Sequence, residues 1–138
     1  MRSNGIKQLR GIGAAIEKIG RDIVREYANR IYNEAVANLK GDSLKRSVRL
    51  ELKNDGSLAS IIVDNEIPVY VEFGTGEHAR IYLAGKPQEM IDEAQKFYIN
   101  GKGTMPAQPW LFPVYYKYRD QIQPEFERRV QKFLDRIK

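Results

Sequence analysis

The sequence predicts an α+β fold made of a long N-terminal helix, a β-hairpin or small antiparallel sheet, a long mobile loop and a C-terminal helix. Apolar residues recur at helical spacing near both ends of the chain, and a two-residue alternation separates these stretches. The 138 residues contain no cysteine, and a chain of this length can bury a core without disulfide bonds. We therefore expect residues 1–138 to fold as a single domain.

The N-terminal helix is predicted from apolar residues that recur every three or four positions. The repeat runs from Ile12 to Leu39, and Gly41 supplies a stop signal. A straight helix over residues 12–40 would be roughly 43 Å long, whereas a compact domain of this length has a radius of gyration of only about 14 Å. We expect the helix either to kink near Gly20 or to project and pack on another subunit.

A β-hairpin is predicted after this helix. Val48, Leu50 and Leu52 alternate with charged residues, the period of a strand with one buried face. A turn at residues 54–57 leads into a second apolar run at 58–64. An isolated hairpin is marginal in water, so this one must pack on the long helix or extend a sheet.

The second half of the chain predicts short helices around a long connection. Pro68 and Gly74 bound a segment of one or two helical turns, with a strand as the alternative. Residues 77–104 show no sustained periodicity, although 87–99 has room for one short helix, and connections this long are commonly functional arms or disordered segments. From residue 111 the apolar residues follow helical spacing again, and Pro124 predicts a kink or a break there.

Charge is unevenly distributed along the sequence. The net charge of +5 divides into +6 for residues 1–50, −5 for 51–100 and +4 for 101–138. A basic excess is one mark of nucleic-acid binding, but the positive residues here alternate with Asp and Glu along the two helical patterns, which is typical of solvated helix faces. A small basic DNA- or RNA-binding module is therefore kept as the alternative function.

Catalytic and metal-binding patterns are not found, and we predict no enzymatic activity, no cofactor and no metal. His78 is the single histidine and has no second nitrogen or sulfur ligand in the sequence. The stretch 74–76 lacks the spacing of a phosphate-binding loop and precedes Glu77. Glu66, Glu72 and Glu77 are candidates for an acid–base pair. We prefer a structural role in which Glu72 accepts hydrogen bonds from nearby backbone amides and holds the Gly-Thr-Gly turn.

Three segments, Gly41–Val48, Tyr70–Thr75 and Pro106–Pro113, resemble in order the motifs of a family of small bacteriophage neck proteins. The family comprises tail-completion, head-tail joining and minor tail proteins of long-tailed double-stranded DNA phages and prophages. The similarity extends over nearly the whole chain. Trp110 stands where the family usually has phenylalanine, which retains a large aromatic side chain, and residues 112–114 also depart from the family pattern.

The resemblance implies a virion structural protein that joins the phage head to the tail. It implies an α+β subunit that forms a ring, a hexamer or dodecamer, at the neck or the top of the tail, after assembly in the host cytoplasm. Its partners would be the connector or head-completion protein and the tail tube or tail terminator protein. Basic helix faces could also meet passing DNA without sequence preference. A membrane partner is not expected.

The candidate assembly residues lie in the two compact motifs. Residues 77–104 between them are interpreted as an assembly arm that orders on a neighbouring subunit. Trp110 and Phe112 are aromatic side chains of the type that dominates interface energies. The full set is Tyr70, Glu72, Phe73, Gly74, Thr75, Gly76, Pro106, Pro109, Trp110, Leu111 and Phe112.

Overall fold

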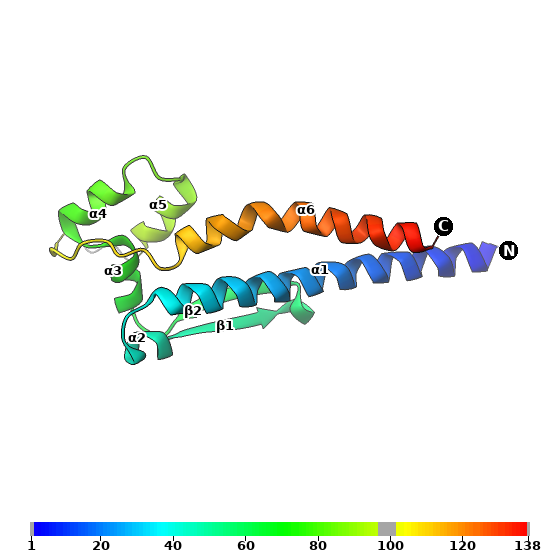
Figure 1. Cartoon of the computed structure of the whole chain (residues 1–138), viewed down its shortest axis with the longest axis horizontal. Coiled ribbons are helices and arrows are strands. Elements are labelled where there is room, and N and C mark those ends of the chain that lie inside the picture. Colours follow the sequence, from blue (N-terminus) through cyan, green and yellow to red (C-terminus); the bar gives the residue numbers. More distant parts are fainter. Residues whose placement is uncertain (1, 97–101, 138) are drawn as a thin grey trace.

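The computed structural model describes residues 2–96 and 102–137, with side chains from residue 7 onward, and its mixed helix and hairpin content confirms the α+β prediction. Two long helices, α1 and α6, run side by side in opposite directions, and the hairpin lies along α1 (Figure 1). The short helices α3, α4 and α5 gather at the end opposite the two termini (Figure 1). The elements are α1 (Arg2–Asn38), α2 (Asp42–Arg46), β1 (Val48–Lys53), a 3₁₀ turn (Asn54–Gly56), β2 (Leu58–Val63), α3 (Ile67–Phe73), α4 (Gly76–Leu83), α5 (Gln88–Gln95) and α6 (Phe112–Arg136).

Helix α1 is one uninterrupted helix of 37 residues, about 56 Å long at 1.5 Å per residue. It begins ten residues before the predicted start at Ile12 and continues through Gly20 without a break. Gly20 faces α6, because a Cβ at this position would lie 3.8 Å from the ring of Phe126. The predicted apolar face is buried at Ile23, Tyr27, Ile31, Ala35 and Leu39.

The hairpin forms with the predicted strands. Val48 pairs with Val63, Leu50 with Ile61 and Leu52 with Ala59, so these residues share one face. Ile61 and Val63 pack on the buried cluster that contains Ala35 and Leu39 of α1, and the Tyr32 hydroxyl donates a hydrogen bond to the Val48 carbonyl oxygen at 3.1 Å. The hairpin therefore packs on α1, the first of the two predicted arrangements, and does not depend on a larger sheet within the described residues.

The segment 77–104 differs from the predicted long mobile loop. Its described part contains two helices, α4 and α5, where at most one was expected. Ala79, Met90 and Ala94 are buried, and Met90 and Ala94 pack against Phe73. The four-residue spacing of Met90 and Ala94 places both on one face of α5, a pattern too short to be distinguished in the sequence. Residues 97–101 lie outside the described structure.

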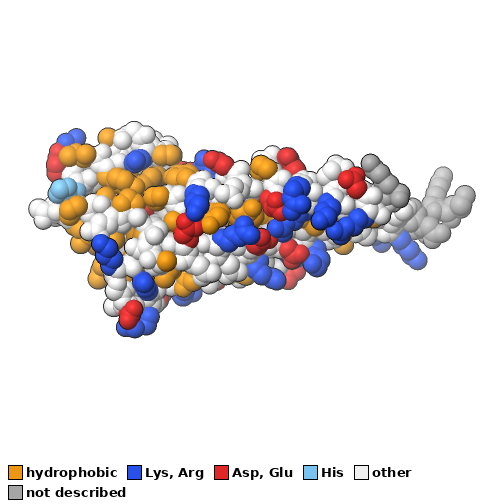
Figure 2. Space-filling model, in the orientation of Figure 1, with side chains coloured by type: hydrophobic (Ala, Val, Ile, Leu, Met, Phe, Trp, Pro, Cys, Tyr) orange, Lys and Arg blue, Asp and Glu red, His pale blue; other side chains and the backbone are white. Residues whose placement is uncertain are grey.

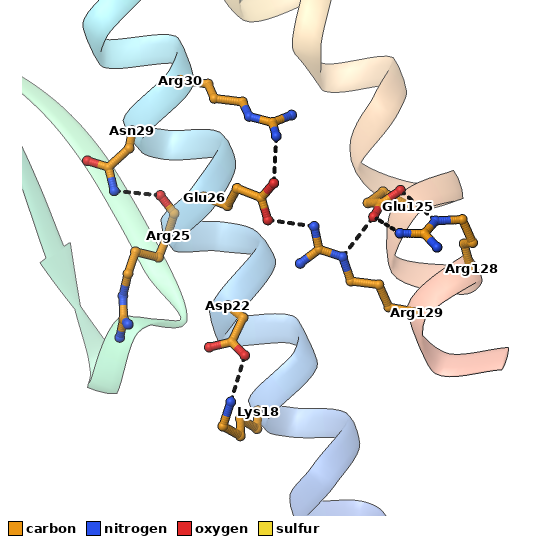
Figure 3. Close-up of polar contacts among 9 residues, drawn as sticks. All are labelled: Lys18, Asp22, Arg25, Glu26, Asn29, Arg30, Glu125, Arg128 and Arg129. Atoms are coloured by element: carbon orange, nitrogen blue, oxygen red, sulfur yellow. Dashed lines mark hydrogen bonds and ion pairs between the residues drawn. The ribbon is translucent and has the colours of Figure 1, made fainter. Parts of the chain in front are cut away.

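Helix α6 continues through Pro124. Of the two predicted alternatives, a kink or a break, the break is therefore wrong. Proline removes one helical hydrogen bond, but contacts with α1 hold the helix on both sides of it. Before Pro124, the Tyr118 hydroxyl donates to Glu34 at 2.6 Å. After it, Arg129 bridges Glu26 at 2.5 Å and Glu125 at 2.8 Å (Figure 3). The Tyr118–Glu34 and Arg129–Glu26 contacts therefore join α6 to α1 on both sides of Pro124.

Candidate functional site

The candidate site is centred on the buried carboxylate of Glu72 in α3, which is 2% exposed. It accepts three backbone hydrogen bonds: Oε2 from the N–H groups of Trp110 and of Leu111, the latter at 3.1 Å, and Oε1 from Phe112 at 2.7 Å. The predicted hydrogen bonding to backbone amides is confirmed. The donors, however, lie 38 to 40 residues away, in the second motif and not in the Gly-Thr-Gly turn. Because α6 begins at Phe112, Glu72 serves as the acceptor that the first amides of this helix require.

Trp110 lies in the protein core, so its predicted role as an interface anchor is wrong. Its side chain is 2% exposed and packs with Leu39 and Val48. The indole N–H donates to the Pro68 carbonyl oxygen at 2.8 Å, and the Asn38 side-chain amide donates to the Trp110 carbonyl oxygen at 3.3 Å. Trp110 is thus buried by its own chain, and its indole N–H already has an acceptor. It joins α1, α3 and the start of α6 within one subunit.

The chain that approaches α6 lies directly against the end of α3. The Gln108 N–H donates to the Val71 carbonyl oxygen at 2.7 Å, and Thr75 and Met105 exchange two hydrogen bonds of 2.9 and 2.8 Å. Gly74, with φ 77°, ends α3 at the point of closest approach. A Cβ there would lie 2.8 Å from the Ala107 nitrogen, closer than nonbonded atoms approach. Glycine is therefore required both by the left-handed backbone and by the neighbouring chain.

The remaining predicted residues occupy the periphery of this arrangement. Phe73 is buried, and its ring centroid lies 5.7 Å from that of the half-buried Phe112. Gly76 is buried at the start of α4. Tyr70 donates its hydroxyl to Glu66 at 2.6 Å near the surface, and this hydrogen bond raises the pKa of Tyr70. Pro106 and Pro109 are exposed.

The electrostatics of Glu72 suit a structural carboxylate. Burial raises its pKa, and the three backbone N–H donors oppose that shift. Both oxygens are occupied by backbone donors at the start of a helix. The other two candidate carboxylates have different partners: Glu66 accepts from Tyr70, and Glu77 pairs with Arg80, whose hydrogen bond lowers the pKa of Glu77. Hydrogen bonds therefore do not link the three acids into the acid–base pair considered from the sequence.

An apolar groove lies beside this centre and was not predicted. It encloses about 580 Å³ between α1, the hairpin, α5 and the start of α6. Among the described residues that line it, the charged ones are Glu89 and Glu93 of α5, and both are acidic. The sequence contains one sign of this groove, a second set of apolar positions on α1. That sign was not enough to predict the groove, because the elements that enclose it are distant from one another in sequence. Apolar and aromatic lining residues include Val24, Ala28, Leu58, Ile61, Phe112 and Tyr115.

Comparison with protein-family models, curated proteins and solved structures finds no match for this chain. Within residues 2–96 and 102–137, no helix is both long and apolar enough to span a membrane. The same described residues contain no cluster of three or more Cys, His, Asp or Glu side chains placed to hold a metal ion.

Proposed function

We propose that this protein is a structural component of a bacteriophage particle, a ring-forming subunit that joins the head connector to the tail. The observation that carries the proposal is the contact between its two motifs. Glu72 of the Tyr-Val-Glu-Phe-Gly-Thr segment accepts the backbone amides of Trp110, Leu111 and Phe112 in the Pro-Ala-Gln-Pro-Trp-Leu-Phe segment. Two short motifs that resemble those of neck proteins, and that are each weak alone, thereby form one structural unit in this chain.

The shape and surface of the subunit support an assembly role. The rod of α1 and α6 projects from the broad end that contains α3, α4 and α5 (Figure 1). Large apolar side chains are exposed at both ends, with Leu9 at 70%, Ile67 at 52% and Ile81 at 62%. Together with the apolar groove, these residues offer several separate contact surfaces. A ring subunit requires at least two contact surfaces for its two neighbours in the ring, in addition to the surfaces that contact the connector and tail proteins.

The alternative function, a small basic DNA- or RNA-binding module, has weaker support. Tyr116 and Tyr118, which could stack on bases, donate their hydroxyls to Glu89 and Glu34 at 2.9 and 2.6 Å. Figure 2 shows Lys and Arg interspersed with Asp and Glu along the long helices, on the face drawn. A phosphate-binding surface requires clustered positive charge. A titration of duplex DNA binding against salt would detect such a function as affinity that falls steeply with added salt.

Electron microscopy of particles made without this protein tests the proposal. A joining protein is required after head filling and tail assembly are complete, so its absence should leave filled heads separate from finished tails. Supplying the purified protein to such an extract should restore joined particles. Normal virions in the absence of the protein would refute the proposal.

A further inference from the structure

The amino-terminal part of α1 carries an apolar face that its own chain covers only in part. Helix α1 extends past the carboxyl end of α6 (Figure 1), and Leu9 is 70% exposed. Leu9, Ile12 and Ile16 continue the spacing of the apolar face that is buried farther along α1, and the cover increases from exposed Leu9 to half-buried Ile12 and Ile16. With Gly13 they occupy positions i, i+3, i+4 and i+7, the pattern by which an amphipathic helix binds an apolar groove.

The groove between α1, the hairpin, α5 and α6 is an acceptor of matching chemistry. Its lining is mainly apolar, and its volume of about 580 Å³ is in the range of sites that take up several side chains. The amino-terminal end of the same chain cannot fill it. Val24 and Ala28 of α1 form part of its wall, and α1 is continuous from Arg2 onward. A helix cannot fold back onto its own middle without breaking, so residues 7–16 can reach such a groove only on another molecule.

The charges of the two surfaces are complementary. Between residues 7 and 16 the charged side chains are Lys7 and Arg10, both basic. The charged residues of the groove, Glu89 and Glu93, are acidic. Glu89 already pairs with Arg119 and Glu93 with Lys96, each at 2.9 Å. These pairs are about half exposed and therefore weak, so an approaching Lys or Arg can share the carboxylates.

We propose that residues 7–16 of one copy of this protein bind in the groove of a second copy. The two surfaces differ and lie on different parts of the subunit, so the contact is head to tail and each subunit can both donate and accept. Repetition of such a contact closes a ring when the rotation per subunit permits. The inference rests on the proposed function, because it identifies the contact between neighbours in the proposed ring.

The test uses the full chain and two substitutions on opposite sides of the contact. Leu9→Asp places a carboxylate in the donor helix, and Leu58→Asp places one at the groove, where Leu58 is 47% exposed. Multi-angle light scattering over a concentration series should show oligomers for the wild type and monomers for each variant. The dissociation constant should rise at least about tenfold, the factor given by 1.4 kcal/mol. Ile81→Asp on α4 is the matched control, because Ile81 is an exposed apolar residue (62%) that belongs to neither side of this contact. It should leave self-association of the purified protein unchanged, even where it weakens a contact with a connector or tail protein.

Mixing the two variants distinguishes this contact from other modes of association. Leu9→Asp keeps an intact groove and Leu58→Asp keeps an intact donor helix, so an equimolar mixture should form one-to-one dimers that grow no further. Circular dichroism should show both variants folded. Wild-type protein that stays monomeric, variants that assemble normally, or a mixture without dimers would each overturn the inference. If Leu9→Asp assembles normally while particles lacking the protein remain unjoined, the inference fails and the proposed function stands. If the oligomers require Leu9 but virions made without the protein are normal, the inferred contact stands and the proposed function fails.

Discussion

Removal of the Glu72 carboxylate should strongly destabilise the fold. In Glu72→Ala, three backbone N–H groups at the start of α6 lose their acceptor. The Trp110 amide is buried and has no access to water, whereas those of Leu111 and Phe112 are partly buried. An unsatisfied buried donor costs about 1–3 kcal/mol. With about 2 kcal/mol for Trp110 and about 1 kcal/mol for each of the others, the loss is about 4 kcal/mol.

A loss of this size is measurable against a typical total stability of about 5–15 kcal/mol. For a domain of this length it corresponds to a fall in Tm of about 15 °C. Glu72→Gln retains one oxygen but turns an amide NH₂ toward a backbone donor, so we expect an intermediate loss of about 1–2 kcal/mol. Glu77→Gln is the control, because Glu77 is exposed and pairs with Arg80 at the surface, and it should change stability by less than about 0.5 kcal/mol.

Urea unfolding followed by circular dichroism and tryptophan fluorescence measures these differences. The chain has one tryptophan, and Trp110 is the residue whose backbone Glu72 binds. Its emission should therefore shift toward that of exposed indole in Glu72→Ala at lower urea than in the wild type. The free energy of unfolding should decrease from the wild type to Glu72→Gln and further to Glu72→Ala. A Glu72→Ala variant that unfolds at the same urea concentration as Glu77→Gln would refute the assignment of Glu72 as the acceptor that holds α6.

Three further predictions follow from neighbouring contacts. In thermal melts, Gly74→Ala should lower the free energy of unfolding by about 1–3 kcal/mol more than Gly85→Ala. Both glycines have φ near 78°, but of the two only Gly74 has neighbouring backbone atoms within 3 Å of the added Cβ. Burial raises the pKa of Glu72 above its usual 4.5. The stability that the wild type has in excess of Glu72→Gln should therefore be fully present below pH 4.5 and should decline as the pH rises through the raised pKa. Urea midpoints of both proteins measured between about pH 4 and about pH 8 check this. Arg129→Met should cost about 1 kcal/mol in urea unfolding, and Arg128→Met should cost less. Arg129 joins two helices and is 26% exposed, whereas Arg128 is 60% exposed. Equal losses would show that the link between the helices adds nothing to stability.

The elements that periodicity predicts correctly depend on local information. The apolar repeat of α1 and the alternation of β1 are properties of neighbouring residues, and each survives in the structure. Pro68 and Gly74 likewise define α3 from its two ends. Of the two short helices, α5 lies within residues 87–99, where the sequence has room for one short helix, and α4 was not predicted. Neither could be established from periodicity, because eight residues span little more than two turns.

The candidate site was only partly predictable because its contacts are distant in sequence. The residue types around Glu72 indicated a carboxylate that accepts backbone amides, which is correct. The identity of those amides depends on how the chain returns to α3, and no local pattern encodes this. Trp110 illustrates the same limit, since an aromatic residue between Pro109 and Leu111 is equally consistent with an interface or a core. Its burial is decided by α1, through Leu39 and Asn38.

The buried carboxylate and the proposed assembly groove meet at two residues, Leu111 and Phe112. The backbone N–H of each donates to Glu72, and both residues line the groove. The position of this part of the groove wall therefore depends on whether Glu72 holds the first turn of α6. A substitution that weakens the Glu72 contact without unfolding the protein should also weaken self-association, although Glu72 itself is buried. Measured below the unfolding transition, the dissociation constant of Glu72→Gln oligomers should exceed that of Glu77→Gln. If the two constants were equal, the groove wall would be independent of the buried carboxylate, and its position would have to be determined by the packing of Phe112 on Phe73 alone.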